Sequence, residues 1–453
     1  MELLTGLVKQ LWKEVERLKA ENAELRRRLG LDSTNSDQPP SSDGYKKKPI
    51  RPGIPKEKGR RNGGQAGHPG KTLERVAHPD HVEVHLPAQC AGCGRSFGAD
   101  ESYELVQSRQ VFDLPEPRLE VTEHRMGQIE CCGKMQRGDY PAEINAPVQD
   151  GPGVQTLVTL LSVDNKMPLE QICRLFGDRY GYDLNSGTVL EMLERSYEQT
   201  TPLEAATKAY LKGAEVVHFD ETGIRVAGKL HWLHTASTGD CTHLFIHEKR
   251  GEEALASEQS VLTDFQGKAV HDCLPAYFKF DVLLHVLCGA HLLRELNGLK
   301  EDGRVWAQDM HEFLLDLYKR PHPMGIEDEI RKRYQIILEQ ADQEEPPPIK
   351  GKRGRPKQSP GCNLLDRLRT HPDGVLAFAL QAGVPFTNNQ AERDLRPSKV
   401  KLKVSGCFRT VKGARIYARI QAAISTFQKR GLKVFTSLYQ VVSFPAAGSS
   451  LGT

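Results

Sequence analysis

Two aspartates, Asp220 and Asp272, each stand at the end of a short apolar run. Residues 216–219 and 267–271 have the pattern of buried β-strands, so each run would carry its acid to the edge of a sheet. A charged carboxylate is costly to remove from water unless it gains a partner or a metal ion. A lone aspartate at such a position more often caps a turn, but two strands that end alike favour a shared site.

A third acid, Glu392, lies on a predicted helix within the polar segment 385–397. Thr387 followed by Gln390 has the spacing of a capping box, and Pro397 would end or kink the helix. Two strand-end aspartates and one helix glutamate can converge above one sheet edge, where carboxylate oxygens suit magnesium or manganese. Two such ions would activate the nucleophilic oxygen of a phosphoryl transfer and stabilise the leaving oxygen.

Basic residues surround the third acid and continue along the chain after it. Asn389, Glu392 and Arg396 fall on one face of the predicted helix. The cations that would neutralise a phosphate or contact DNA are Arg393, Arg396, Lys399, Lys401 and Lys403. A second basic run at 350–357 contains a flat tetrapeptide that could lie in an A·T-rich minor groove, although a solvated loop has the same composition. Its cations are Lys352, Arg353 and Arg355.

Alternation and turn residues predict the elements that must position the acids. The strand at 216–219 is followed by a turn at 222–223 and a second strand at 231–236, which together indicate a hairpin. A third strand is expected at 242–247 and a helix at about 251–262. The acids would therefore be carried by a sheet whose later strand ends at the second aspartate.

Three neighbouring acids compete with the chosen ones. Glu221 follows Asp220 directly, so in a strand the two side chains point to opposite faces of the sheet. Asp281 begins another apolar run, and Asp394 lies on nearly the opposite helix face from Glu392. We therefore predict that the two strand-end aspartates act with Glu392.

The clustered cysteines indicate a zinc site, because in a reducing cytosol clustered thiols are more often metal ligands than disulfides. The predicted ligands are Cys90, Cys93, Cys131 and Cys132. The first two have the Cys-x-x-Cys spacing of a zinc knuckle, whereas the second two are adjacent and chelate one ion poorly. Either they complete a strained site, or His85 or His124 supplies a ligand, or the site has decayed. Small strands are expected at 105–112 and 119–124.

Residues 4–29 carry a heptad pattern that predicts a parallel two-stranded coiled coil and hence a homodimer. The apolar and register-setting positions are Leu4, Val8, Leu11, Val15, Leu18, Asn22, Leu25 and Leu29. The alternative is a single amphipathic helix packed on its own domain. Residues 32–75 are rich in Ser, Pro, Gly and basic side chains, a composition typical of a flexible arm that contacts DNA phosphates or merely links domains.

Two amphipathic segments at 168–176 and 188–195 are predicted helices, with a turn at 177–184 and a cap at Asn185 or Ser186. Such a pair could be a helix-turn-helix. It could equally be a plain helical connection, because the second segment is rich in glutamate and suits a major groove poorly.

The length of 453 residues suits two to four domains, and the net charge of +3 says little about partners. No run of 18 apolar residues exists, so the sequence predicts no membrane span. The charged N-terminal stretch is unlike a signal peptide, and we expect a cytoplasmic protein.

Several motifs in order resemble the insertion sequence 66 family of bacterial transposases. They include the N-terminal heptad segment (a leucine zipper), the Cys-x-x-Cys knuckle, and residues 218–222 and 229–234. They also include Asp272 before Tyr277, Cys288 with His291, and residues 388–397 with Asn388 and Asn389. The Asn-Asn-x-Ala-Glu-Arg segment is the most specific. The second knuckle departs from the family pattern, and there Cys132 matches better than Cys131.

The resemblance implies a multidomain chain with a ribonuclease-H-like mixed α/β core, an Asp-Asp-Glu triad and an all-α insertion. The triad maps to Asp220, Asp272 and Glu392. The expected parts are a coiled coil at 1–31, a basic linker at 32–75, a zinc-ribbon-like β domain at 76–150, a helical segment at 151–205, the core at 206–281 and 381–440, the insertion at 282–380 and a tail at 441–453.

The expected function is a nucleoid-associated DNA transposase. It would bind the terminal inverted repeats of its element, cleave them and join the 3′-OH ends to target DNA, with accessory proteins of the same element as possible partners. The alternatives are a catalytically inactive DNA-binding derivative and a metal-dependent nuclease without strand transfer.

Overall fold

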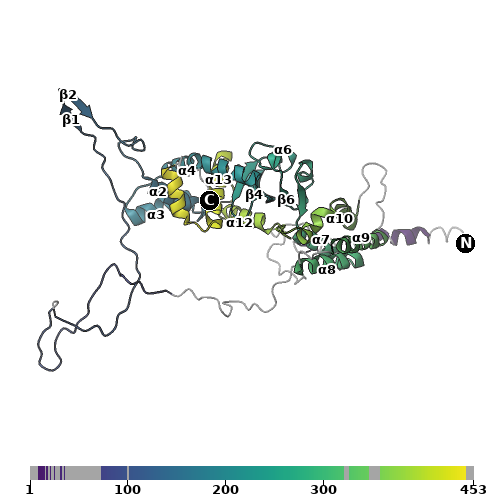
Figure 1. Ribbon diagram of the computed structural model, residues 1–453, viewed down its shortest axis with the longest axis horizontal. Coiled ribbons are helices and arrows are strands. Elements are labelled where there is room, and N and C mark those ends of the chain that lie inside the picture. Colours follow the sequence, from purple (N-terminus) through teal and green to yellow (C-terminus); the bar gives the residue numbers. More distant parts are fainter. Residues whose placement is uncertain are drawn as a thin grey trace.

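The computed structural model describes residues 9–15, 17–18, 21, 25, 31–32, 35, 73–98, 101–320, 326–345 and 358–444. Its body is elongated, with a mixed sheet at the centre and helical groups at both ends (Figure 1). Helices α2, α3, α4 and α14 form one end, and helices α7 to α10 form the other. The chain therefore has the mixed α/β character that the sequence predicts.

The central sheet has five strands in the order β5-β4-β3-β6-β7. They are β3 Val216–Val226, β4 Lys229–Ser237, β5 Thr242–His247, β6 Lys268–His271 and β7 Leu284–Leu287. Strands β3, β4 and β5 pair antiparallel, whereas β6 runs parallel to β3 and β7 runs parallel to β6. The strands predicted at 242–247 and 267–271 are confirmed.

Helices cover both faces of this sheet because alternate strand residues are apolar on each side. On one face, Ile224 and Leu244 pack with Leu395 of α12 Asn389–Ser405 and Ala418 of α13 Val411–Lys429. On the other, Phe219 packs among residues of α5 Thr201–Lys212, α6 Glu252–Leu255 and the short 3₁₀ turns η2 Leu262–Asp264 and η3 Tyr277–Lys279. Burying each such side chain contributes about 1.5–3 kcal/mol.

The hairpin turn lies five residues later than predicted. Strand β3 continues through Thr222 and Gly223, which pair with Leu233 and Trp232 of β4. The chain turns instead at residues 227–228, where φ is 49° and 76°. Two consecutive positive φ values match the right-handed twist of a hairpin. Asp220 is therefore inside a long strand and not at its end.

The helical lobe comprises α7 Gly289–Glu301, α8 Val305–Lys319, α9 Glu327–Glu344, α10 Pro360–Thr370 and α11 Pro372–Leu380. Its core includes the fully buried Trp306 and Met310. The predicted boundary at 282 is too early, because β7 belongs to the sheet. Helix α11 lies close against β7: a Cβ on Gly374 would come within 2.1 Å of the carbonyl oxygen of His285.

The opposite end is formed by α2 Pro152–Val163, α3 Leu169–Tyr180, α4 Ser186–Gln199 and α14 Val434–Ser443. Asn185 caps α4 by accepting a hydrogen bond from the Thr188 backbone N–H, as predicted. Helix α3 extends into the predicted turn and ends at Tyr180, and its C-cap is Gly181, where φ is 60°. The apolar faces of α3 and α4 pack with α13, so this pair is joined to the core.

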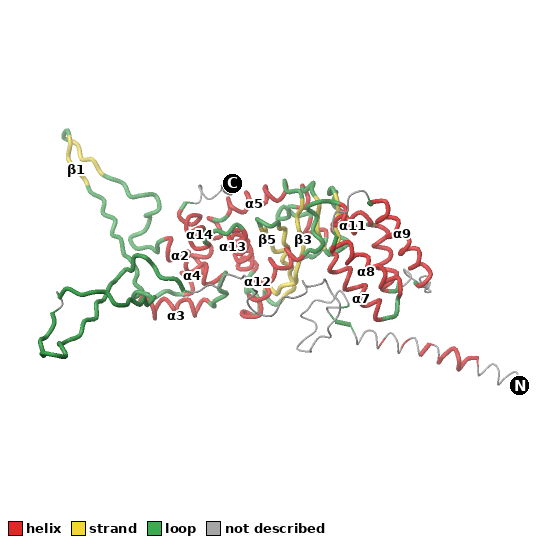
Figure 2. Tube along the Cα trace, turned by 60° about the horizontal axis from the view of Figure 1, so that its bottom comes forward, coloured by secondary structure: helices red, strands yellow, loops and turns green. Residues whose placement is uncertain are grey.

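Residues 73–98 and 101–150 project from the body, and these described residues hold one small hairpin, β1 Gln128–Cys131 with β2 Lys134–Arg137 (Figure 2). The strands predicted at 105–112 and 119–124 are wrong, because both segments are irregular. Val106 and Val121 are 95% and 89% exposed. An alternating pattern forms a strand only where a neighbouring strand or a core receives its apolar side.

The described N-terminal residues 9–15 and 17–18 are helical. The apolar heptad side chains among them and at Leu25 are exposed. The heptad positions at 4, 8, 22 and 29 and the basic segment 46–71 lie outside the described residues. Asn35, at the start of the predicted linker, is buried and donates to Glu301 of α7 at 2.7 Å. In the described parts, no helix is long and apolar enough to cross a membrane.

Candidate active site

The register of two parallel strands sets Asp220 beside Asp272. His218 of β3 is opposite Val270 of β6. Each aspartate lies two residues beyond its member of this pair, so the two occupy equivalent positions on neighbouring strands. Neighbouring strands are about 4.8 Å apart. Asp272 directly follows the last residue of β6, where the pairing with β3 has ended. The two predicted aspartates therefore come together.

Asn388 brings Glu392 to the same place from the other end of the sequence. Its amide Nδ2 donates to the backbone carbonyl of Phe219 at 2.7 Å, and its Oδ1 lies 2.9 Å from Nδ1 of His218. Because Nδ2 is the donor to Phe219, Oδ1 accepts from the histidine. Asn388 precedes α12, and Glu392 is in the first turn of that helix. The predicted capping box at Thr387 is wrong, since Asn388 is the N-cap residue and its side chain bonds β3.

Electrostatic coupling indicates that the three acids share one site. Burial raises the pKa of Asp220 well above its usual range, and the charges of Glu221, Asp272 and Glu392 raise it further. The side chains of Asp272 and Glu392 remain 20% and 25% exposed. Like charges raise the pKa in this way only at short range. An acidic site open to solvent is the result.

A fourth acid, Glu221, lies beneath this site on the other face of the sheet, as strand alternation predicts. Its side chain is fully buried, and it accepts hydrogen bonds from Nε of Arg250 and the hydroxyl of Tyr277, both at 2.8 Å. Burial and the charge of Asp272 raise the pKa of Glu221 to about 7. The sequence pattern gave no sign of a role for Glu221 or for Arg250, which follows β5 outside any motif.

Cys288 and His291 clamp the start of α12 to the start of α7. The Cys288 sulfur accepts the backbone N–H of Asn388 at 3.2 Å. Burial raises the pKa of Cys288, but hydrogen bonds from His291 and Asn388 outweigh it and leave the pKa below its usual value. Arg294 links His291, at 3.3 Å, to Glu392, at 3.9 Å. The family motif thus positions the glutamate-bearing helix.

The carboxylates have the chemistry of a magnesium or manganese site. A bound cation stabilises the ionised form of carboxylates that raise one another's pKa. Oxygen ligands also suit hard divalent ions. Within the described ranges, however, no three His, Cys, Asp or Glu side chains form a group that could hold a metal ion as they stand.

The four predicted zinc ligands form two separate pairs. Hydrogen bonds from the backbone of Cys93 and Gly92 lower the pKa of Cys90, as in a folded knuckle. Cys131 ends β1, and its sulfur lies 3.6 Å from that of Cys132 in the hairpin turn. Since no described group of three ligands exists, the two pairs are not assembled into one site.

Most of the predicted DNA-contacting cations on α12 are available for binding. The exposed ones are Arg393, Arg396, Lys399 and Lys403, and the neighbouring Asn389 is also exposed. Lys401 differs, because its ammonium group donates to the carbonyl of Ser162 at 3.3 Å and burial lowers its pKa. Pro397 lies inside α12 and does not end it. The predicted loop cations Lys352, Arg353 and Arg355 lie outside the described residues.

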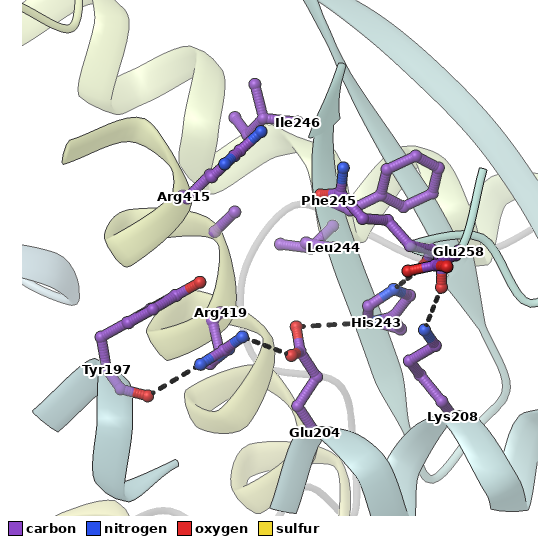
Figure 3. Close-up of a pocket in the computed structure, with 12 residues that line it drawn as sticks. Tyr197, Glu204, Lys208, His243, Leu244, Phe245, Ile246, Glu258, Arg415 and Arg419 are labelled. Carbon is purple, nitrogen blue, oxygen red and sulfur yellow. Dashed lines mark hydrogen bonds and ion pairs between the residues drawn. The ribbon is translucent and has the colours of Figure 1, made fainter. Parts of the chain in front are cut away.

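A cavity of about 360 Å³ lies elsewhere, where α4, α5 and α13 meet β5 (Figure 3). Its charged groups bind one another: Arg419 pairs with Glu204 at 2.8 Å, and Glu204 lies 3.9 Å from His243. The Arg419 guanidinium also lies 3.7 Å from the centre of the Tyr197 ring. This network ties the helices to the edge strand, and it lacks the cluster of carboxylates found at Asp220.

Comparison with known proteins agrees with the motifs. A model of a family of unknown function, DUF6444, matches residues 2–74. A comparison with curated proteins gave no match. The model of the transposase IS66 family matches residues 148–416, which is more than half of the chain and includes all three predicted acids. The chain therefore belongs to the IS66 family of transposases.

Proposed function

We propose that this transposase binds the ends of its insertion sequence, cleaves them and joins the freed 3′-OH ends to target DNA. One observation carries the proposal: Asp220 and Asp272 hold equivalent positions on parallel strands, and their charges and that of Glu392 act at one point. The sheet order β5-β4-β3-β6-β7, with its first three strands antiparallel, supports a ribonuclease-H-like core.

Asp220, Asp272 and Glu392 would hold magnesium or manganese. When bound, two such ions supply charge that activates a nucleophilic oxygen and stabilises a leaving oxygen. The chain's own residues orient the acids. The Asn388 side chain fixes the start of α12 on β3, and the Cys288 sulfur accepts a hydrogen bond from the backbone N–H of Asn388. The exposed cations of α12 would hold the DNA backbone beside the acids.

The proposal extends to partners and to a second metal. The exposed heptad leucines support a homodimer that would bring two element ends together. The knuckle at Cys90 and Cys93 supports structural zinc, with Cys131 and Cys132 as the remaining ligands. Terminal inverted repeats and target DNA are the substrates, so the activity belongs at the bacterial nucleoid, with accessory proteins of the element as further partners.

The test is magnesium- or manganese-dependent cleavage of DNA that carries the element's own end, with wild type beside Glu392→Gln. We expect cleavage by wild type alone. Equal cleavage by both proteins would overturn the role of Glu392. Binding without cleavage by wild type, even with the neighbouring gene products added, would favour the inactive DNA-binding alternative.

The second alternative is a nuclease that hydrolyses DNA without joining it. Supercoiled target DNA separates the two, because strand transfer leaves the element end covalently joined to the target. We expect a joined product in wild type, and its absence despite cleavage would support the nuclease.

A further inference from the structure

Arg250 lies at the acidic site and carries positive charge where the proposed metal ligands carry negative charge. Its Nη2 is 3.8 Å from Oδ2 of Asp272, and its Nε donates to Glu221. The side chain is 42% exposed, so it is accessible to a ligand from solvent. Arg250 is thus an oriented cation at the mouth of the site.

Three groups fix that orientation. Glu221 accepts the Nε–H from a fully buried carboxylate, and Tyr277 donates its hydroxyl to the other oxygen of the same carboxylate. Tyr277 itself is 1% exposed, so this anchor is part of the core. The guanidinium also lies 5.0 Å from the centre of the Trp232 ring, close enough for a cation–π contact. Packing and charge together orient the guanidinium.

The orientation leaves hydrogen-bond donors unused. A guanidinium has five N–H donors in a planar fork. Among the described residues, Arg250 makes a hydrogen bond only through Nε, since 3.8 Å from Nη2 to Asp272 is too long for one. Nη2 lies nearest Asp272, and neither Nη group makes a hydrogen bond within the described residues. Such a fork matches two oxygens of a phosphate.

The site needs a group of this kind. The charges of Glu221, Asp272 and Glu392 all act on Asp220, and carboxylate charge at the site would repel a DNA phosphate. Arg294 lies on the Glu392 side, where it is engaged with His291. Arg250 lies instead beside Asp272. A phosphate that approaches the acids past Asp272 meets Arg250.

We infer that Arg250 binds the scissile phosphate of DNA, and that Glu221 and Tyr277 are positioning residues that aim its two Nη groups at the phosphate oxygens. This inference rests on the proposed function. The alternative is that Arg250 only neutralises Glu221 as a structural ion pair.

Neutralising one phosphate tests the contact directly. Element-end duplexes are prepared with a normal scissile phosphate or with a neutral methylphosphonate there, and their affinities are measured in EDTA so that cleavage plays no part. For wild type we expect about a 10-fold loss with methylphosphonate, as for a lost charge-assisted contact. For Arg250→Gln, affinity is already about 10-fold weaker, and methylphosphonate adds little because both changes remove the same contact.

The matched control is Arg331→Gln. Arg331 has nearly the same exposure, 41%, and also pairs with acids, but it lies on α9 in the helical lobe. This variant loses the same charge and should keep the full methylphosphonate effect. An undiminished effect in Arg250→Gln overturns the assignment of Arg250. Failure of wild type to bind element-end DNA instead contradicts the proposed function.

Two further variants separate positioning from folding. Glu221→Gln should reduce the methylphosphonate effect while general DNA affinity changes little. The arginine keeps its charge in this variant, but its guanidinium loses the carboxylate that orients it toward the phosphate. If Arg250→Gln does not fold, Arg250→Lys keeps the charge and loses the fork, and the effect should again shrink. A full effect in both variants would show that Arg250 and Glu221 form only a structural pair.

Discussion

Glu221 is an acid at a position where its charge is poorly tolerated. Burial and the neighbouring Asp272 raise its pKa to about 7, against about 4.3 in an unfolded chain. The folded state therefore favours the protonated form. The resulting stabilisation is complete below the unfolded pKa and is lost as the pH rises through about 7.

We predict that the free energy of unfolding in EDTA falls between about pH 4.5 and pH 7, and that Glu221→Gln makes this fall shallower. Asp220 adds a fall in the same direction, because its pKa is also raised, so the slope is reduced and not abolished. Urea unfolding at a series of pH values measures the effect. The exposed Glu339→Gln on α9 should keep the wild-type slope, and an unchanged slope in Glu221→Gln would contradict the prediction.

At this scale the sequence predicted the acids but not the arginine beside them. Asp220 and Asp272 could be predicted because each ends an apolar run, and two runs that end alike indicate a shared site. Arg250 could not, because its position depends on the Trp232 ring and on a carboxylate that faces away from Asp220. Contacts between loops and strands leave no periodic signal. Arginine is common on protein surfaces, so its residue type alone does not distinguish it from a solvated side chain.

At the scale of elements, the start of α12 decides where Glu392 lies. The sequence predicts a helix there correctly but places its cap at Thr387, because local spacing favours a capping box. In the fold, Asn388 is the N-cap residue and uses its side chain to bond His218 and the Phe219 carbonyl. A long-range contact replaces the local one.

Removing that contact should loosen the helix that carries Glu392. We predict that Asn388→Ala lowers the free energy of unfolding by about 1–3 kcal/mol, because it leaves the buried Phe219 carbonyl without its donor. DNA cleavage should fall by more than stability alone explains. The adjacent Asn389→Ala is the control, since Asn389 is exposed and should change stability by about 0.5 kcal/mol or less. Equal effects of the two variants would contradict the role of Asn388.

The projecting segment 73–150 poses a different question at the same scale. None of its described apolar residues is buried and its two cysteine pairs are apart, so little in the segment alone holds it together. A zinc ion bound by both pairs would supply that constraint. The predicted strands at 105–112 and 119–124 failed for the same reason, since the sequence pattern assumed a core that the segment lacks.

We therefore predict one zinc per chain in the purified protein, lost in Cys90→Ser and in Cys93→Ser. Single substitutions at Cys131 and Cys132 then identify which of the adjacent thiols binds the ion, and Cys132→Ser should cause the larger loss. Metal analysis after dialysis is the measurement, with Cys407→Ser as a control outside the segment. Zinc content that no substitution at the four positions changes would overturn the site.

For the whole molecule, the helical lobe does more than separate two parts of the core. It lies in sequence between Asp272 and Glu392, yet Cys288, the N-cap residue of its first helix, accepts the backbone N–H of Asn388 at the start of α12. Asn35 also contacts its α7 through Glu301. The order of strands and helices was largely predictable, whereas the boundary at β7 was not, because a short apolar strand resembles the start of a buried helix.

The last prediction concerns how two copies meet. Leu11, Leu18 and Leu25 fall at one heptad position, and all three are at least half exposed, so no described part of the same chain covers them. Leucine at this position suits a parallel pair of helices. We predict a dimer by light scattering, and a monomer when the three leucines become alanine. The control replaces the exposed Lys9 and Lys13 with alanine and should remain dimeric. The monomeric variant should still bind a single element end but should no longer hold two ends in one complex. A wild-type monomer, or a leucine variant that stays dimeric, would show that the helix packs elsewhere and that two ends are paired by another surface.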